Sequence, residues 1–226
     1  MQRNILIIAP HADDEVLGCG GIISKYSNEG FEVHILVATN ASIGAPELFN
    51  QEGIDNVRNE AIAAHKILNV KQTHFLELPA PRLDVYPNYQ IAIAFSEIIN
   101  EIRPEALFIP HRGDIHKDHE AVFNAALVAA RPINNCSVKK IYAYETLSET
   151  EWAAPFGDDN FIPNRFVNIT KEFKLKLEAM ECFKSQLKPF PNPRSLEAIE
   201  ALAKYRGATV GFERAEAFMV IRETED

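Results

Sequence analysis

Two short clusters of histidines and acidic residues are the parts of this 226-residue chain whose types and spacing could do chemistry. The first cluster is His11-Ala12-Asp13-Asp14-Glu15, and the second is His116-Lys117-Asp118-His119. Imidazole and carboxylate groups are common zinc ligands, and a catalytic zinc site takes about three of them and leaves one position for water. The two clusters together therefore predict one metal site that is assembled from both.

The candidate ligands are His11, Asp14 and His119, with Asp13 beside them. Adjacent side chains diverge from an extended or helical backbone, so Asp13 and Asp14 are not expected to bind the same ion. One carboxylate can bind the metal while its neighbour faces the bound water. A metal lowers the pKa of that water to about 7, so the neighbouring carboxylate can accept its proton.

The second cluster also contains groups that could support a metal site. His116 and His119 are three residues apart at a predicted helix start, so they share roughly one face. Asp118 lies between them and could orient an imidazole by a hydrogen bond. Alone, acidic residues at a helix N-terminus or histidines on a surface would be unremarkable. Those readings do not explain why both clusters directly follow a predicted strand.

Apolar runs alternate with amphipathic stretches and predict the elements that must position these residues. The predicted strands are Ile5–Ala9, Phe31–Ala38, Thr73–Leu76, Ala106–Ile109, Lys140–Tyr144 and Ala217–Ile221. The predicted helices are Asp14–Asn28, Val57–Leu68, Ile91–Ile102, Asp118–Arg131 and Phe173–Met180. The alternation predicts an α/β fold, a three-layer sandwich with a mostly parallel sheet and its site at the C-terminal ends of the strands.

The segments between these elements carry further expectations. Asn40–Gly53 is expected to be a loop, and Trp152–Pro163 a loop or lid over a pocket. The run Gly18–Gly21 does not fit a dinucleotide fingerprint, because its glycines lie inside the helix rather than in the turn before it. They are expected to let the helix pack closely on the sheet. His34, His65 and His74 lie within strand or helix patterns and are expected to be structural.

The composition is that of an ordinary globular protein with one domain over residues 1–226. A net charge of −9 argues against nucleic-acid and anionic-membrane partners, and no apolar run reaches membrane-spanning length. Three scattered cysteines, Cys19, Cys136 and Cys182, fit a reducing compartment, and no signal peptide opens the chain. We expect a cytoplasmic protein.

The two clusters and their surroundings carry a family resemblance. Pro10–Glu15, followed by Leu17-Gly18 and Gly20-Gly21, closely resembles the signature of the LmbE-like, PIG-L-type family of zinc-dependent N-deacetylases, with Ala12 in place of the usual proline. His116–His119 resembles the second signature of that family, with Lys117 in place of proline. Val57–Glu60 is similar to an arginine- and glutamate-bearing family helix, and Ala215–Phe218 to a common family ending. The resemblance implies a Rossmann-like fold.

The resemblance also implies a role for each residue of the two clusters. It implies that zinc is bound by His11, Asp14 and His119. Asp13 would be the general base that deprotonates the attacking water. His116 would stabilise the oxyanion and protonate the leaving amine, and Asp118 would tune His116.

The expected substrate residues are Arg58 and Arg82. Arg58 matches a family arginine that holds polar groups of the substrate. Many members carry an aspartate that contacts a sugar hydroxyl where this chain has Ala80. Arg82 or Asp84 would compensate for its loss, or the substrate would differ from simple N-acetylglucosaminides.

The expected function is removal of an acetyl group from an N-acetylated amino sugar, such as an N-acetylglucosaminyl conjugate, by attack of zinc-bound water. Three alternatives stay open. The enzyme could cleave a different amide, such as a thiol-conjugate or acyl-peptide amide. The chain could be a metal- or sugar-binding module without catalysis. Fe²⁺ could replace Zn²⁺ in vivo, because two imidazoles and a carboxylate suit both ions. The resemblance is also compatible with a homo-oligomer.

Overall fold

The computed structural model describes residues 3–225 and builds them around one central sheet. Seven strands within these residues form the sheet in the order β3-β2-β1-β4-β5-β7-β6. They are β1 (Asn4–Ala9), β2 (Glu32–Asn40), β3 (Gln72–Pro79), β4 (Ala106–Pro110), β5 (Lys140–Tyr144), β6 (Arg165–Asn168) and β7 (Ala215–Glu223). Strands β1 to β5 are parallel, while β7 runs antiparallel to both β5 and β6. The predicted α/β class and mostly parallel sheet are confirmed.

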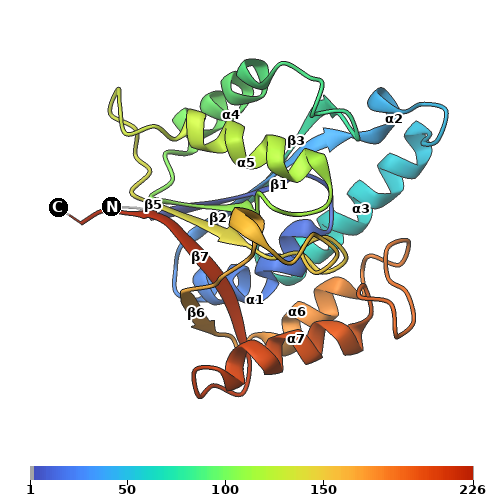
Figure 1. The fold of residues 1–226 in the computed structure, drawn as a ribbon, viewed down its shortest axis with the longest axis vertical. Helices are drawn as coiled ribbons and strands as arrows, with labels where there is room; N and C mark the ends of the chain where they lie inside the picture. The colour runs from blue at the N-terminus through green and yellow to red at the C-terminus, as the bar shows by residue number, and fades with distance from the viewer. Residues whose placement is uncertain (1–2, 226) are drawn as a thin grey trace.

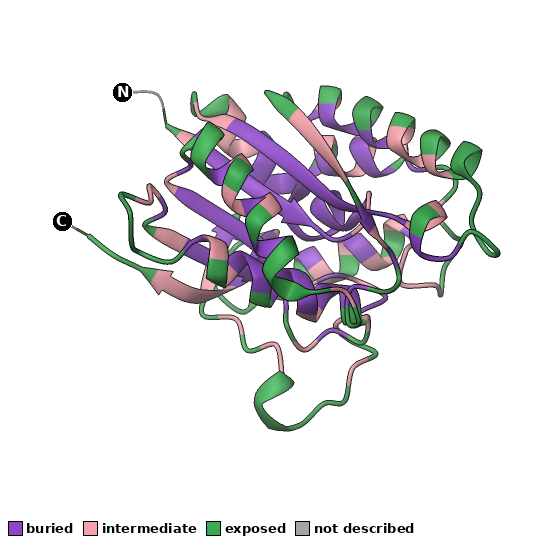
Figure 2. Cartoon of the chain, turned by 90° about the horizontal axis from the view of Figure 1, so that it is seen from above, coloured by how far each residue is buried: buried purple, intermediate pink, exposed green. Residues whose placement is uncertain are grey.

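Helices cover both faces of the sheet, as Figure 1 shows. One layer holds α4 (Asn88–Ile102) and α5 (Lys117–Ala129), and the other holds α1 (Asp14–Asn28), α3 (Gln51–Ile67), α6 (Phe173–Met180) and α7 (Leu196–Ala208). The short elements α2 (Ala41–Gly44) and η1 (Gly157–Asp159) lie in connections. Each face of the sheet packs its own cluster of buried apolar side chains, which follows from the period-two alternation of side chains along a strand. The central strands β1, β2, β4 and β5 are accordingly almost entirely buried, as the purple ribbons in Figure 2 show.

Two parts of the chain differ from the sequence-based expectation. The predicted loop Asn40–Gly53 contains α2 and the first residues of α3, because Asn40 and Asn50 each cap a helix with their side-chain oxygens. Strand β6 was not predicted; it is four residues long and lies at the sheet edge, where a short run gives little periodic signal. No helix within residues 3–225 is long and apolar enough to cross a membrane.

Close packing of α1 against the sheet depends on its glycines, as the sequence suggested. A Cβ atom at Gly18 would lie 2.3 Å from the ring of Tyr144, and one at Gly21 would lie 2.7 Å from Ile169. Neither approach is compatible with a larger residue unless the packed side chain moves. The glycines therefore set how closely α1 can approach the end of β5 and the residue that follows β6.

Candidate metal centre and active site

The two polar clusters meet where the strand order of the sheet reverses. Strands β2 and β3 follow β1 on one side of the sheet, while β4 and β5 lie on the other side of β1. Ligand sites of open α/β sheets form at this switch point, outside the carboxyl ends of the strands. His11 directly follows β1, and the loop after β4 leads to His116 at the N-cap of α5.

A strained turn separates the side chains of Asp13 and Asp14. Asp13 has φ 130° and ψ −28°, outside the regions that residues with a side chain usually adopt. Its backbone N–H donates to Glu15 Oε2 over 3.1 Å, and the backbone N–H of His11 donates to Asp14 Oδ2 over 2.9 Å. The other carboxylate oxygen of Glu15 lies 2.9 Å from His65 Nε2. Glu15 therefore holds the turn by its hydrogen bond to Asp13, and His65 in turn holds Glu15.

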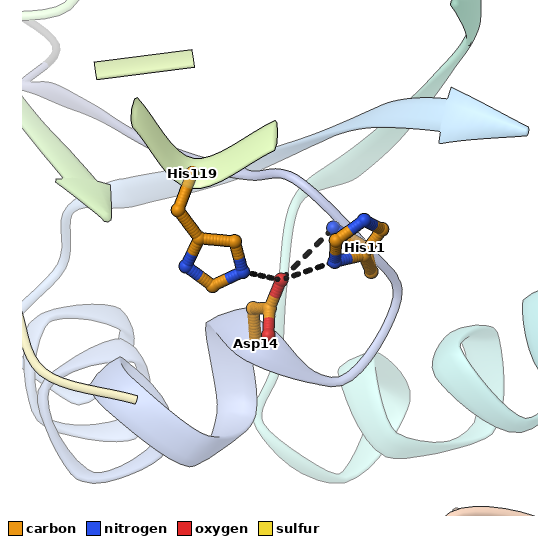
Figure 3. Close-up of side chains that lie close together, drawn as sticks. All are labelled: His11, Asp14 and His119. Atoms are coloured by element: carbon orange, nitrogen blue, oxygen red, sulfur yellow. Dashed lines mark hydrogen bonds and ion pairs between the residues drawn. The ribbon is translucent and has the colours of Figure 1, made fainter. Parts of the chain in front are cut away.

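One set of three side chains forms a candidate metal site (Figure 3). Ligand atoms of His11, Asp14 and His119 all lie within 4.8 Å of one another. Asp14 Oδ2 is 3.3 Å from His11 Nδ1 and 3.3 Å from His119 Nε2. Asp114 Oδ2 lies 2.7 Å from His119 Nδ1, so it fixes the tautomer that leaves the Nε2 lone pair free.

The free atoms of this set fit a metal ion. His119 Nε2 and Asp14 Oδ1 are buried, and neither has a hydrogen-bond partner among residues 3–225. Buried polar atoms normally have a partner, because an unsatisfied one is costly. Two imidazole nitrogens and a carboxylate are also a common donor set for catalytic zinc and ferrous ions. His11, Asp14 and His119 could therefore hold a divalent metal.

A second set, His11, His116 and Asp118, also has ligand atoms within 4.8 Å of one another. The metal-binding atoms of this second set already have hydrogen-bond partners within the protein. Asp118 Oδ1 accepts from the backbone N–H of Leu83 over 3.0 Å, and Asp118 Oδ2 lies 3.1 Å from His11 Nε2. His116 Nδ1 accepts from the backbone N–H of Asp118 over 3.1 Å. These contacts favour the first set as the metal ligands and place Asp118 as the partner of His11.

The surroundings of the first set favour positive charge. Burial lowers the pKa of His119, but the carboxylates of Asp14 and Asp114 outweigh it and raise the pKa to about 10. Burial also lowers the pKa of His11, but its contacts with Asp118 and Asp14 outweigh burial and raise the pKa to about 9. Burial also disfavours the charged form of Asp14, yet the two histidines hold its pKa well below the usual range. A metal cation bound at this site would be stabilised by the same carboxylates that raise the pKa values of the two histidines.

Asp13 has different surroundings from Asp14. Its side chain is 2% exposed, and burial raises its pKa to about 8, although Arg194 opposes the shift. Arg194 Nη1 lies 3.2 Å from Asp13 Oδ2, an ion-pair contact. A carboxyl group with a pKa near neutrality is well matched to accept and return a proton.

His116 is held as a neutral imidazole. Burial and the neighbouring His11 lower its pKa to about 4. Because Nδ1 accepts the Asp118 N–H, the ring proton must lie on Nε2. His116 lines the cavity beside Asp13, so this N–H is available as a donor there.

A cavity of about 520 Å³ opens at the site, within the size range of small-molecule pockets. Its lining includes His11, Asp13, His116, Arg58 and Arg194. His11 follows β1, Asp13 is the N-cap of α1, and His116 is the N-cap of α5. Arg58 lies within α3, and Arg194 directly precedes Ser195, the N-cap of α7. Figure 1 shows how these elements are arranged around the sheet.

The two arginines predicted to bind substrate have different positions. Arg58 lines the cavity and pairs with Glu77 Oε1 over 2.7 Å. Arg82 is exposed, lies outside the described cavity lining, and approaches the backbone oxygen of Gly44 at 3.5 Å. Asp84 is likewise exposed and outside that lining. The structure thus brings Arg58 to the cavity but not Arg82, whose role in substrate binding stays a prediction.

The predicted lid does not cover this cavity. Within the described lining of the 520 Å³ cavity there is no residue of the segment 152–163. The segment instead lines a smaller cavity of about 260 Å³. His111 Nε2, 2.7 Å from the backbone oxygen of Asp159, holds the segment against the β4–α5 loop, and Arg112 contacts Asp159 Oδ1 over 3.2 Å.

Sequence reasoning missed three supporting residues. Asp114 orients His119, His65 contacts Glu15, and Arg194 contacts Asp13. Asp114 could have been suspected, because it lies in the same strand-to-helix loop as the second cluster. His65 and Arg194 are far from the clusters in sequence, so only the folded chain shows their contacts.

Comparisons with known proteins agree with this architecture. The sequence model of the PIG-L family, described as GlcNAc-PI de-N-acetylase, matches residues 6–130. The uncharacterized deacetylase YaiS of Escherichia coli is 30% identical over 189 residues, which cover 81% of this chain and 92% of that protein. A probable N-acetyl-alpha-D-glucosaminyl L-malate deacetylase 2 of Bacillus cereus is 26% identical over 82% of this chain and 84% of its own length.

Among solved structures, N,N'-diacetylchitobiose deacetylase from Pyrococcus horikoshii has the same fold. It superimposes with a TM-score of 0.78 over 97% of this chain and 84% of that chain, at 23% identity. The family match covers both polar clusters, and the structural match covers the sheet and both helix layers. The chain belongs to the PIG-L family of deacetylases.

Proposed function

We propose that this chain is a zinc-dependent hydrolase that removes the acetyl group from an N-acetylated amino sugar. The observation that carries the proposal is that Asp13, His11 and His116 line one cavity, while the candidate ligands Asp14 and His119 lie buried next to His11, with Asp14 Oδ1 and His119 Nε2 lacking a hydrogen-bond partner within residues 3–225. Membership of a deacetylase family supports the reaction class. The name of the Bacillus cereus relative supports an amino sugar conjugate as substrate.

The residues around the proposed metal have separable tasks. His11, Asp14 and His119 would hold the ion, which when bound supplies Lewis acidity toward water and the amide carbonyl. Asp13 accepts a proton from the attacking water, for which its raised pKa suits it. The Nε2–H of His116 donates a hydrogen bond to the oxygen that gains negative charge.

Products form when the C–N bond of the amide breaks and leaves acetate and an amine. The amine must gain a proton as it leaves. The proton on Asp13 is available for this step, whereas His116, with a pKa lowered to about 4, is neutral near pH 7 and does not carry the second ring proton that it would have to donate. This arrangement supports hydrogen-bond donation as the task of His116 more than its predicted task as the acid for the amine.

The test is amine release by protein that has been stripped of metal and reloaded. We expect release of the amine from N-acetylglucosamine conjugates with Zn²⁺, and no release after chelation. Parallel loading with Fe²⁺ tells which ion supports the higher turnover. A panel that adds acyl-peptide and thiol-conjugate amides separates sugar deacetylation from a general amidase activity. One bound zinc per chain without amine release from any substrate would instead favour a binding module.

The cellular location, the partners, the oligomeric state and the domain organisation are proposals of the same kind. We place the protein in the cytoplasm, on the support of three cysteines that pair with no other cysteine. We propose that its partner is a small N-acetylated sugar conjugate and that nucleic acid is not a ligand, on the support of the net charge of −9. A homo-oligomer and a single domain over residues 1–226 stay proposals that light scattering and limited proteolysis would test.

A further inference from the structure

Both arginines among the described residues of the cavity lining are already paired with groups of the protein. Among the residues described, two side chains with permanent positive charge line the cavity, Arg58 and Arg194. Arg58 donates to Glu77 Oε1 over 2.7 Å and to the backbone oxygen of Leu76 over 3.1 Å. These contacts tie its guanidinium to β3.

Arg194 is tied just as closely. Its Nη1 lies 3.2 Å from Asp13 Oδ2, and its Nη2 lies 3.6 Å from Glu149 Oε1. Its Nε donates to Ser148 Oγ over 2.7 Å, and its Nη1 also donates to Gln186 Oε1 over 3.1 Å. A substrate carboxylate would therefore compete with Glu77 at Arg58, and with Asp13 and Glu149 at Arg194.

The segment before α3 and the first turns of α3 give the same cavity an apolar wall. Leu48, Phe49, Ile54 and Val57 line it, together with the buried methyl group of Ala80. The side chains of Leu48 and Phe49 are 73% and 44% exposed. Large apolar side chains that are exposed at the wall of a ligand cavity commonly mark a binding surface.

The wall is held in place by local structure. The backbone N–H groups of Leu48 and Phe49 both donate to the backbone oxygen of Ala45 over 3.0 Å. Asn50 caps α3 by accepting from the N–H of Gly53 over 2.8 Å. Phe49 and Ile54 thus occupy the two positions flanking a helix start whose side chains commonly pack together. This wall is formed before a ligand arrives.

We propose that Leu48 and Phe49 form a subsite for an apolar aglycone, so that the substrate class is a neutral alkyl or aryl conjugate of an N-acetylated amino sugar. This inference rests on the proposed function and adds to it the group attached to the sugar. The aglycone stacks against Phe49 and covers Leu48, while the acetamido group meets Asp13 and the metal ligands. The expected substrate differs in charge from the malate conjugate that names the Bacillus cereus relative.

The test uses zinc-loaded full-length protein and three probes. These are the methyl, benzyl and 4-carboxybenzyl glycosides of N-acetylglucosamine, each as both anomers. We expect kcat/KM for the benzyl glycoside to exceed that for the methyl glycoside by about tenfold, as burial of an aromatic ring predicts. We expect the 4-carboxybenzyl glycoside to lose that advantage. Calorimetric binding of the three deacetylated amines should rank in the same order without depending on turnover.

Variants assign the preference to the wall. Phe49→Ser and Leu48→Ser should each lower the benzyl-to-methyl ratio of kcat/KM. Leu48→Lys adds a free cation and should shift the preference toward the 4-carboxybenzyl probe. Ile43→Ser is the matched control, because Ile43 is 50% exposed in the neighbouring α2 but lies outside the described cavity lining. Zinc content and melting temperature show that each variant is folded.

Several results would overturn the inference. Equal kcat/KM for all three probes, with amine released from each, would contradict the subsite while leaving the deacetylase function intact. A preference for 4-carboxybenzyl in the wild-type protein would contradict it as well. No amine release and no ranked binding would remove both proposals. If Leu48→Ser changes the mass in light scattering but not the probe ratio, a second copy of the chain covers this wall instead.

Discussion

Asp13 and Asp14 are neighbours in sequence, yet the structure gives them opposite electrostatic surroundings. Asp14 lies between two histidines and its pKa falls, whereas Asp13 is buried and its pKa rises to about 8. The separation follows from the backbone at Asp13, where φ of 130° turns the two side chains apart. A single turn thus provides one carboxylate suited to a metal and one suited to a proton.

Asp114 should control metal affinity through His119. Its carboxylate lies 2.7 Å from His119 Nδ1, and its other oxygen accepts from Thr150 Oγ1 over 2.6 Å. We expect Asp114→Asn to weaken zinc binding by about 10- to 100-fold, as loss of such a partner typically does. Competition with a chromophoric chelator measures the affinity, and Asp84→Asn serves as the exposed control. Unchanged zinc affinity in Asp114→Asn would contradict this orienting role.

Sequence reasoning reached the ligand set because ligand types followed predicted strands. The family resemblance implied that Asp118 tunes His116, whereas the Asp118 carboxylate lies nearer to His11, at 3.1 Å against 3.9 Å from His116. That pairing depends on how α5 meets β1, which spacing within the second cluster does not encode. Arg194 could not be linked to Asp13 for the same reason, since its contact depends on where the segment before α7 crosses the cavity.

At the scale of elements, α1 and α3 meet through a buried polar contact behind the site. His65 of α3 is 3% exposed and bridges Thr73 Oγ1 of β3, at 2.8 Å, and Glu15 of α1, at 2.9 Å. Glu15 in turn accepts the N–H of Asp13. Periodicity predicted both helices and a structural His65, but not that His65 connects α3 to the turn at Asp13 through Glu15.

His65→Leu should therefore destabilise the protein. It would leave the fully buried carboxylate of Glu15 without its imidazole partner, and a buried polar group that loses its hydrogen bond costs about 1 to 3 kcal/mol, or more when it is charged. The free energy of unfolding from urea titration measures the loss. His65→Gln retains an amide that can donate to Glu15 and should lose less. Equal stability of His65→Leu and wild type would show that the contact does not support the turn.

At the scale of the molecule, the order of the strands explains why distant residues share one site. The sequence predicted the alternation of strands and helices, which implies that the loops after parallel strands lie together at one edge of the sheet. The position of β1 between β2 and β4 brings His11 to His119. The antiparallel edge formed by β7 and β6 was not predicted, because strand order at an edge depends on long-range pairing rather than on local pattern.

The central claim is that Asp13 moves the proton while His11, Asp14 and His119 hold the metal. The most direct test is turnover of an N-acetylglucosamine glycoside by Asp13→Asn, loaded with one zinc per chain and compared with wild type loaded in the same way. We expect amine release to fall by about 10²- to 10⁴-fold with zinc content unchanged, the usual contribution of a general base. Near-normal turnover of the zinc-loaded variant would contradict the account.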